Sequence, residues 1–163
     1  MMKSFLRMIG ILGFNNLGVV SEGKVFRSAQ PNYYCLPWEL NIKTVLDLQD
    51  NSDHENANRR NTTELYGIRY LSLRLNILSE LTVEDFDLVV QALSNPDNQP
   101  ILVHCQSGAD RTGVACAAYR MVVDSWTLTE ALEELECYGG GIHDVLNLKL
   151  KDHLEDYAKG FPL

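Results

Sequence analysis

A cysteine and an arginine stand close together in the segment His-Cys-Gln-Ser-Gly-Ala-Asp-Arg-Thr-Gly, which covers residues 104–113. The residues between Cys105 and Arg111 are enough to wrap the chain once around a tetrahedral anion, with backbone N–H groups pointing inward and a helix N-terminus behind them. Gly108 permits the positive φ that such a loop needs. The spacing therefore predicts a phosphate-binding loop built around a nucleophile.

Cys105 is the predicted nucleophile of this loop. Backbone donors that bind phosphate also stabilise a thiolate, which attacks phosphorus in line and forms a thiophosphate intermediate that water hydrolyses. The guanidinium of Arg111 is a planar fork that grips two phosphate oxygens. The alternatives are a buried structural cysteine and an arginine in a surface ion pair. The loop residues expected to bind the substrate phosphate are Gln106, Ser107, Gly108, Ala109 and Thr112.

The His-Cys pair, the five residues after it and the final Arg-Thr resemble the signature of the protein tyrosine phosphatase superfamily. The ending Gly-Ala-Asp-Arg-Thr-Gly is similar to that of the compact bacterial tyrosine and dual-specificity phosphatases. The resemblance extends to residues 25–31 and 126–132, and so covers residues 20–158. It implies a single phosphatase domain over residues 20–163 after an N-terminal segment of residues 1–19.

The resemblance also implies roles for the two neighbours of this loop. Thr112 matches a hydroxyl that hydrogen-bonds the nucleophilic sulfur and eases hydrolysis of the intermediate, although an ordinary helix cap explains this residue as well. His104 is expected to brace the loop through its ring nitrogens rather than to transfer protons.

The general acid, which protonates the leaving oxygen, is left open by the sequence. Most members of the superfamily use an aspartate on a separate upstream loop, but residues 73–80 contain no aspartate and only Glu80 as a carboxylate. In the bacterial phosphatases that the chain resembles, an aspartate at the position of Asp110 is assigned this role. The alternatives are Asp110, Glu80 and no dedicated acid, and Asp110 is also well placed as a carboxylate at a helix N-terminus.

Two positions depart from the pattern of the superfamily. Related loops often carry lysine where this chain has Ala109, and that lysine suits polyanions such as phosphoinositides. Relatives commonly end the preceding strand with arginine, where this chain has Gln49. A second basic contact near the pocket would then have to come from Arg27 or Arg74.

The elements that must position the loop are predicted from hydrophobic pattern and from turn and capping signals. Strands are expected over residues 24–28, 44–48, 69–73 and 101–104, and helices over residues 31–40, 55–66, 82–93, 112–123, 129–138 and 143–157. This alternation predicts an α/β fold, with a central, partly parallel sheet flanked by helices and a helical C-terminal part. The loop would lie at the carboxyl end of a strand, where open α/β sheets bind ligands.

The composition limits location and partners. The chain has 163 residues, enough for one domain, and its net charge of −8 argues against nucleic acid or an anionic membrane surface as a partner. The four cysteines lack the spacing of a zinc site or a disulfide framework, so no metal or other cofactor is expected. A reactive thiol needs a reducing compartment, which predicts a cytoplasmic location. The apolar run of residues 8–14 is too short to span a membrane, with a signal peptide or anchor as the alternative.

The other cysteines and a group of aromatic residues have weaker signals. Cys116 is expected in the core, with a disulfide to an oxidised Cys105 as the alternative, and Cys35 and Cys137 suggest packing alone. The aromatic residues that follow the first predicted strand either wall a pocket or belong to the core; they are Tyr33, Tyr34 and Trp38.

These observations predict a metal-independent phosphatase that acts on phosphotyrosine, with phosphoserine and phosphothreonine as further substrates. Its partners would be phosphorylated proteins or small-molecule phosphates. The rivals are a phosphatase of inositol phosphates or phosphoinositides, a phosphate-binding module with weak activity, and a sulfur transferase of the rhodanese type.

Overall fold

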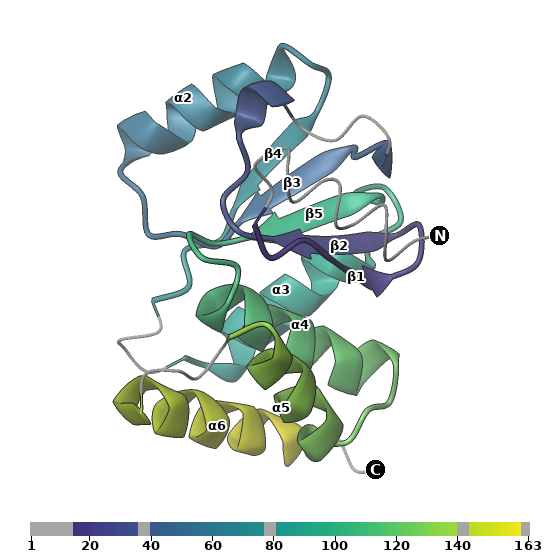
Figure 1. The fold of residues 1–163 in the computed structure, drawn as a ribbon, viewed down its shortest axis with the longest axis vertical. Coiled ribbons are helices and arrows are strands. Elements are labelled where there is room, and N and C mark those ends of the chain that lie inside the picture. Colours follow the sequence, from purple (N-terminus) through teal and green to yellow (C-terminus); the bar gives the residue numbers. More distant parts are fainter. Residues whose placement is uncertain (1–14, 36–39, 77–80, 140–143, 161–163) are drawn as a thin grey trace.

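The computed structural model describes residues 15–35, 40–76, 81–139 and 144–160 (Figure 1). Five strands form one sheet in the order β1-β2-β5-β3-β4. Their bounds are β1 Gly18–Ser21, β2 Val25–Ser28, β3 Thr44–Asp47, β4 Arg69–Ser72 and β5 Ile101–His104. The four strands from β2 to β4 in this order are parallel, and β1 pairs with β2 in the antiparallel direction. The predicted central, partly parallel sheet is confirmed.

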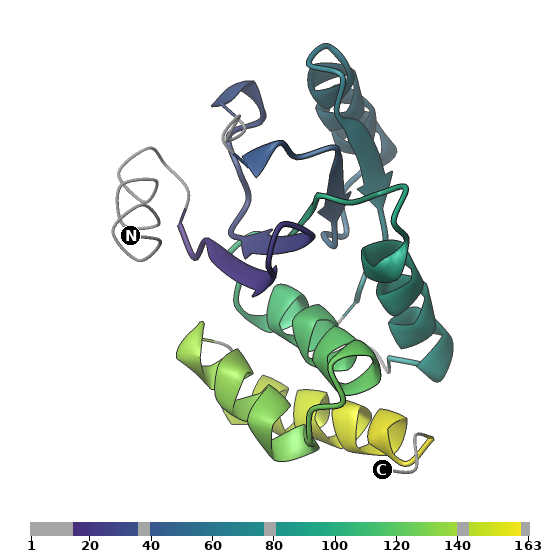
Figure 2. The same ribbon diagram turned by 90° about the vertical axis from the view of Figure 1, so that its right-hand side faces the viewer.

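Helices cover both faces of the sheet (Figures 1 and 2). The short 3₁₀ helix η1 and helix α2 lie on one face, and α3, α4, α5 and α6 lie on the other. Their bounds are η1 Tyr33–Cys35, α2 Asp53–Glu64, α3 Val83–Ser94, α4 Asp110–Val123, α5 Leu128–Cys137 and α6 Asp144–Ala158. None of these described helices is long and apolar enough to cross a membrane.

The strands supply both cores by alternation, because successive side chains of a strand point to opposite faces. Leu46 and Val103 face α3 to α6 and belong to the larger core, which is mainly aliphatic but also contains Phe86, Tyr119 and Tyr157. Val45 and Leu102 face η1 and α2, where a smaller core also contains aromatic rings. Strands β3 and β5 are short and wholly buried. Because they are parallel neighbours, their carboxyl ends bring the residues that follow them to one edge of the sheet.

Three helices begin with a capping box, in which the N-cap hydroxyl and the N3 carboxylate each bind the other's backbone N–H. The pairs are Ser52 with Glu55 in α2, Thr82 with Asp85 in α3, and Thr127 with Glu130 in α5. The sequence predicted the start of α3 from this signal, and that prediction is confirmed. Helix α4 has no side-chain cap bond, because its N-terminus opens on the loop that follows β5.

The structure differs from the predicted elements in four places. Of the helix predicted over residues 31–40, residues 31–32 are not helical, Tyr33–Cys35 form the 3₁₀ helix η1, and residues 36–39 lie outside the described residues. Helix α2 begins and ends two residues before its predicted bounds. Strand β1 was not predicted, since its four residues contain glycine and pair only through a tight turn with Gly23 at φ +66°. The predicted domain boundary between residues 19 and 20 falls inside β1, and it stays a prediction. Helix α4 begins at Asp110, two residues before the predicted start, because the turn of the loop runs directly into the helix.

Candidate active site

The predicted phosphate-binding loop connects β5 to α4 and encloses a pocket of about 200 Å³. The pocket lies at the carboxyl end of β5, as expected for an open α/β sheet. Its lining residues are Cys105, Gln106, Ser107, Asp110 and Arg111, and all five were predicted as site residues. The structure therefore brings the predicted nucleophile, the arginine and one candidate acid to a single small cavity.

Four consecutive backbone carbonyls of the loop each accept a hydrogen bond from a group that does not line the pocket. The bonds are His104 Nδ1 to Cys105 O at 3.2 Å, Gln30 N to Gln106 O at 3.1 Å, Asn16 Nδ2 to Ser107 O at 3.0 Å and Arg27 Nη2 to Gly108 O at 2.8 Å. In a trans peptide the N–H points opposite to the C=O, and the loop has no cis bond. The N–H groups of residues 106–109 therefore turn inward.

Gly108 is required in this loop for two reasons. Its φ is +71°, in the left-handed region that side chains disfavour. A Cβ at this position would lie 2.6 Å from Ser28 O and 2.5 Å from Ala29 N, which are backbone atoms of the neighbouring strand. The glycine lets the loop lie against the end of β2, and the prediction of its positive φ is confirmed.

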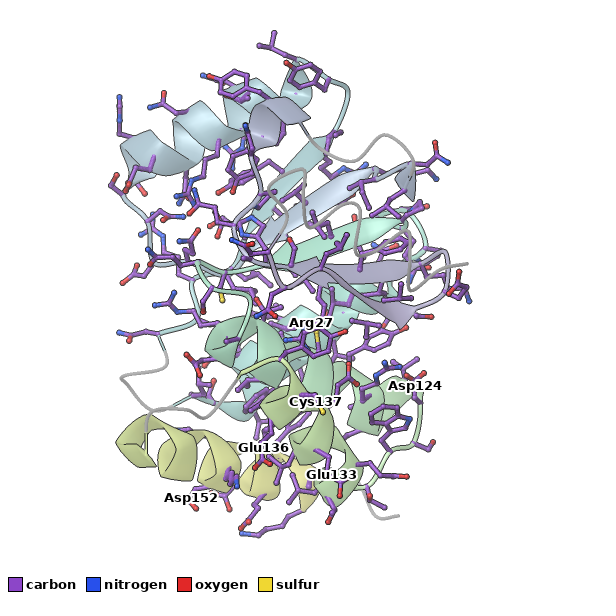
Figure 3. All side chains as sticks on the ribbon, viewed as in Figure 1. Arg27, Asp124, Glu133, Glu136, Cys137 and Asp152 are labelled. Atoms are coloured by element: carbon purple, nitrogen blue, oxygen red, sulfur yellow. The ribbon has the colours of Figure 1, made fainter. Side chains whose placement is uncertain are left out.

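Arg27 binds the loop on the side away from the pocket and is not a second basic contact for substrate. Its side chain is fully buried between the sheet and the helices (Figure 3). Its guanidinium stacks 3.7 Å from the ring centroid of Tyr138, and Nη1 lies 3.9 Å from the carboxylate of Glu134. The other proposed contact, Arg74, forms an exposed ion pair with Asp53.

His104 is fully buried and makes a hydrogen bond from each ring nitrogen. Nδ1 lies 3.2 Å from Cys105 O, and Nε2 lies 2.9 Å from the hydroxyl of Tyr33. Burial lowers the pKa of His104, although the nearby carboxylate of Asp47 opposes this shift. A neutral imidazole that braces the backbone after Cys105 fits the role expected for His104.

Asp47 lies opposite His104 in the register of β3 and β5 and is completely buried. The side chains within hydrogen-bond distance of its carboxylate are Arg59, at 2.5 Å and in an ion pair, Tyr70 at 2.8 Å, Asn51 at 3.0 Å and Tyr33 at 3.4 Å. Burial, followed by the charge of Asp47, raises the pKa of both tyrosines, so they stay neutral donors. Sequence reasoning missed this network. Asp47 could have been found, because it is a carboxylate at the end of a buried strand that lies next to the strand of His104.

Two buried polar atoms at the start of α4 have no hydrogen-bond partner among the described residues: Arg111 Nε and Thr112 Oγ1. The structure thus contains neither the expected bond from Thr112 to the sulfur of Cys105 nor a helix-cap bond from its hydroxyl, and the role of Thr112 stays a prediction. Asp110 is the first residue of α4 and lines the pocket. Glu80 lies outside the described residues.

The other cysteines and aromatic residues differ in their surroundings. Cys116 is buried in α4, and burial raises the pKa of its thiol to about 11, while Cys137 is exposed on α5 (Figure 3). Tyr33 belongs to the smaller core and Tyr34 is 69% exposed, so neither lines the pocket. Trp38 lies outside the described residues, as does the side chain of Cys35. In the described part of the chain, His, Cys, Asp and Glu form no group of three or more that could hold a metal ion.

A model of the tyrosine phosphatase family matches residues 11–158. The chain belongs to the tyrosine phosphatase family. Among the relatives of this phosphatase chain, the dual specificity protein phosphatase TpbA of Pseudomonas aeruginosa is 31% identical over 122 residues, which cover 74% of this chain and 53% of TpbA. The inositol diphosphatase Siw14 of Saccharomyces cerevisiae is 32% identical over 121 residues, which cover 69% of this chain and 41% of Siw14. The chain therefore spans about half the length of these relatives, or less.

A solved structure of P. aeruginosa TpbA in complex with phosphotyrosine matches this phosphatase with a TM-score of 0.71 and 26% identity, and the match covers 89% of each chain. The fold expected from the resemblance is confirmed by this match. Sequence reasoning missed the outer supports of the loop, which are the residues that hold it from outside the pocket, such as Asn16 and Tyr138. Their contacts depend on the tertiary fold and not on the spacing of residues along the chain.

Proposed function

We propose that this phosphatase hydrolyses phosphate monoesters through Cys105, with phosphotyrosine as a substrate and phosphoserine and phosphothreonine as further ones. The observation that carries the proposal is the set of outward carbonyls at residues 105–108, since it turns four N–H groups toward a pocket that holds a thiol. An anion in the pocket would also bind the unpartnered Nε of Arg111. The complex of TpbA with phosphotyrosine supports the choice of substrate.

The proposed reaction has two steps at phosphorus. Cys105 Sγ attacks as the thiolate, so that the S–P bond forms while the bond to the leaving oxygen breaks, and Asp110 gives its proton to that oxygen. Water then attacks phosphorus and returns a proton to Asp110 as the S–P bond breaks, which releases phosphate and the thiolate. Arg111 and the loop N–H groups stabilise the negative charge on the transferred group. The proposal needs no metal or other cofactor.

A second substrate class is an inositol phosphate or phosphoinositide, which the similarity to Siw14 favours. Against it, Arg111 is the only cation among the residues that line the described pocket, and the net charge of the chain is −8. A monoester with one phosphate fits these charges better. We further propose a reducing, cytoplasmic location, because the thiolate is oxidised elsewhere, with phosphorylated proteins or small phosphates as partners.

Replacement of the nucleophile tests the proposal. Cys105→Ser should abolish turnover of an aryl phosphate, because a hydroxyl is a far weaker nucleophile than a thiolate, and it should keep binding to a phosphotyrosine peptide through the loop N–H groups and Arg111. Cys137→Ser, which changes an exposed cysteine outside the pocket, is the matched control and should keep full activity. Full turnover by Cys105→Ser would overturn the mechanism, and peptide binding without turnover by the unaltered chain would favour a binding module.

The leaving group identifies the acid. Asp110→Asn should lower kcat on tyrosyl phosphates by roughly 10²- to 10⁴-fold, the usual cost of a lost general acid. It should affect an activated nitrophenyl ester much less, because that leaving group needs no proton. If Glu80→Gln shows this dependence instead, the role belongs to Glu80, and if neither variant shows it, there is no dedicated acid.

A further inference from the structure

The imidazole of His104 lies among residues of the smaller core, on the face of the sheet that η1 and α2 cover. Nδ1 lies 3.2 Å from Cys105 O and 3.9 Å from Asp47 Oδ1, and both oxygens only accept hydrogen bonds. Nε2 lies 2.9 Å from the hydroxyl of Tyr33, and the same hydroxyl lies 3.4 Å from Asp47 Oδ2. Because this hydroxyl has one proton, it donates to only one of the two, and the contact to Nε2 is the shorter. The two ring nitrogens therefore have different neighbours: Nδ1 faces two acceptors, and Nε2 faces a hydroxyl.

We infer that Tyr33 is a positioning residue of the proposed reaction, because it donates to Nε2 and so fixes His104 as the neutral tautomer that carries its proton on Nδ1. This inference rests on the proposed function of the loop. Nδ1–H then donates to Cys105 O, the first of the four outward carbonyls. Without a donor at Nε2, one of the groups that fix the proton on Nδ1 is lost, and the bond that orients the peptide between Cys105 and Gln106 is weakened.

Asp47 favours the same tautomer, because its Oδ1 lies on the Nδ1 side of the His104 ring at 3.9 Å. Asp47 is fully buried, and its ion pair with Arg59 anchors the carboxylate to α2. Its Oδ1 accepts from the backbone N–H of Gln49 at 2.9 Å, so the carboxylate cannot turn away from Tyr33 and His104 without losing this bond. The line of contacts from Arg59 through Asp47 and Tyr33 to His104 joins α2 to the nucleophile loop.

Tyr70 offers a matched control for this role. Its hydroxyl donates to the same Asp47 Oδ2 at 2.8 Å, and its ring packs edge-on against Tyr33 in the same core. The second bond of this hydroxyl is to Asn56 at 3.1 Å and not to His104. Tyr33→Phe and Tyr70→Phe thus each remove one buried hydroxyl beside Asp47, and only the first removes a partner of His104.

The experiment compares these two variants in the full chain labelled with ¹⁵N-histidine. In the unaltered protein the ring of His104 should show protonated Nδ1 and unprotonated Nε2, with its signals identified by their loss in His104→Asn. Tyr33→Phe should shift the Nε2 resonance and lower kcat for an aryl phosphate by roughly 10- to 100-fold, the usual cost of a misplaced catalytic group. Tyr70→Phe should leave both the ¹⁵N signals of His104 and kcat unchanged.

A double-mutant cycle separates positioning from a general loss of stability. In His104→Asn, the amide N–H₂ can donate to Cys105 O in place of Nδ1–H. An amide nitrogen always carries its protons, so this bond does not depend on a donor from Tyr33 to fix their position. Tyr33→Phe should therefore have no further effect on kcat in the His104→Asn protein. An equal loss in both backgrounds would overturn the inference, as would equal losses for the two tyrosine variants or a proton on Nε2 in the unaltered chain.

The role of Tyr33 can still be tested if the proposed function fails. If the unaltered chain does not hydrolyse aryl phosphates, the ¹⁵N spectra and the dissociation constant for inorganic phosphate still measure the effect on the loop. Tyr33→Phe should then weaken phosphate binding relative to Tyr70→Phe, and the same affinity in both variants would count against the role of Tyr33.

Discussion

The two faces of the sheet bury different kinds of side chain, although the same strands supply both. On the face of α3 to α6, β3 and β5 contribute aliphatic residues such as Leu46 and Val103. On the face of η1 and α2, the last residues of the same strands are Asp47 and His104, joined to tyrosines and Arg59. On the polar face, His104 binds the carbonyl of Cys105, whereas the buried Arg27 binds Gly108 O from the face of α5. We therefore expect changes of aliphatic side chains on the face of α3 to α6, called here the aliphatic face, to alter stability alone. Changes on the polar face that reach His104 should alter stability and activity together.

The largest effect is expected from Asp47→Asn on the polar face. The change leaves the half-buried guanidinium of Arg59 without its counter-charge, and the loss of one partner of a buried pair costs about 4 kcal/mol of unfolding free energy. It should also lower kcat, because the charge of Asp47, whose Oδ1 lies 3.9 Å from His104 Nδ1, no longer favours the proton on Nδ1. Urea unfolding and aryl phosphate turnover measure the two effects. The exposed pair of Arg74 with Asp53 is the control, since Asp53→Asn should change neither.

A change on the aliphatic face should have a smaller and simpler effect. Leu93 of α3 is fully buried, and Leu93→Ala removes its contacts and leaves a cavity, at a cost of about 3 kcal/mol. The kcat of the folded fraction should equal that of the unaltered chain. If kcat falls as far as in Asp47→Asn, the two faces do not divide stability and activity as we expect.

The difference between these regions also accounts for which parts of the molecule could be predicted from the sequence. The pocket was predicted because its lining residues follow one another in the chain, and the aliphatic face because its strands are apolar runs. The outer supports of the loop were not predicted, since Asn16 and Arg27 lie 91 and 81 positions from the carbonyls that they bind. The polar network was not predicted for the same reason, because its members come from separate elements that only the tertiary structure brings together.

The pH dependence of stability should reveal the buried imidazole. Burial lowers the pKa of His104 in the folded chain below its value of about 6.5 in the unfolded chain, so the unfolded state binds more protons between these two values. Stability is therefore complete above pH 6.5 and falls with acid, by up to about 1.4 kcal/mol per pH unit until the folded pKa is reached. Urea unfolding from pH 5 to 8 should show this slope. His104→Asn should flatten it, and the exposed His54→Asn should not; equal slopes in all three proteins would contradict the assignment.

The smallest effect is expected from Cys116, which is buried on the aliphatic side in α4. With a pKa raised to about 11 by burial, its thiol carries almost no thiolate at pH 7, and only the thiolate attacks an oxidised sulfur. Cys116→Ala should therefore keep the kcat of the unaltered chain, and after peroxide treatment it should regain activity with thiol reductant at the same rate. Faster recovery of the unaltered chain, with a Cys105–Cys116 disulfide found by mass spectrometry, would mean that the aliphatic face also takes part in the chemistry of the loop.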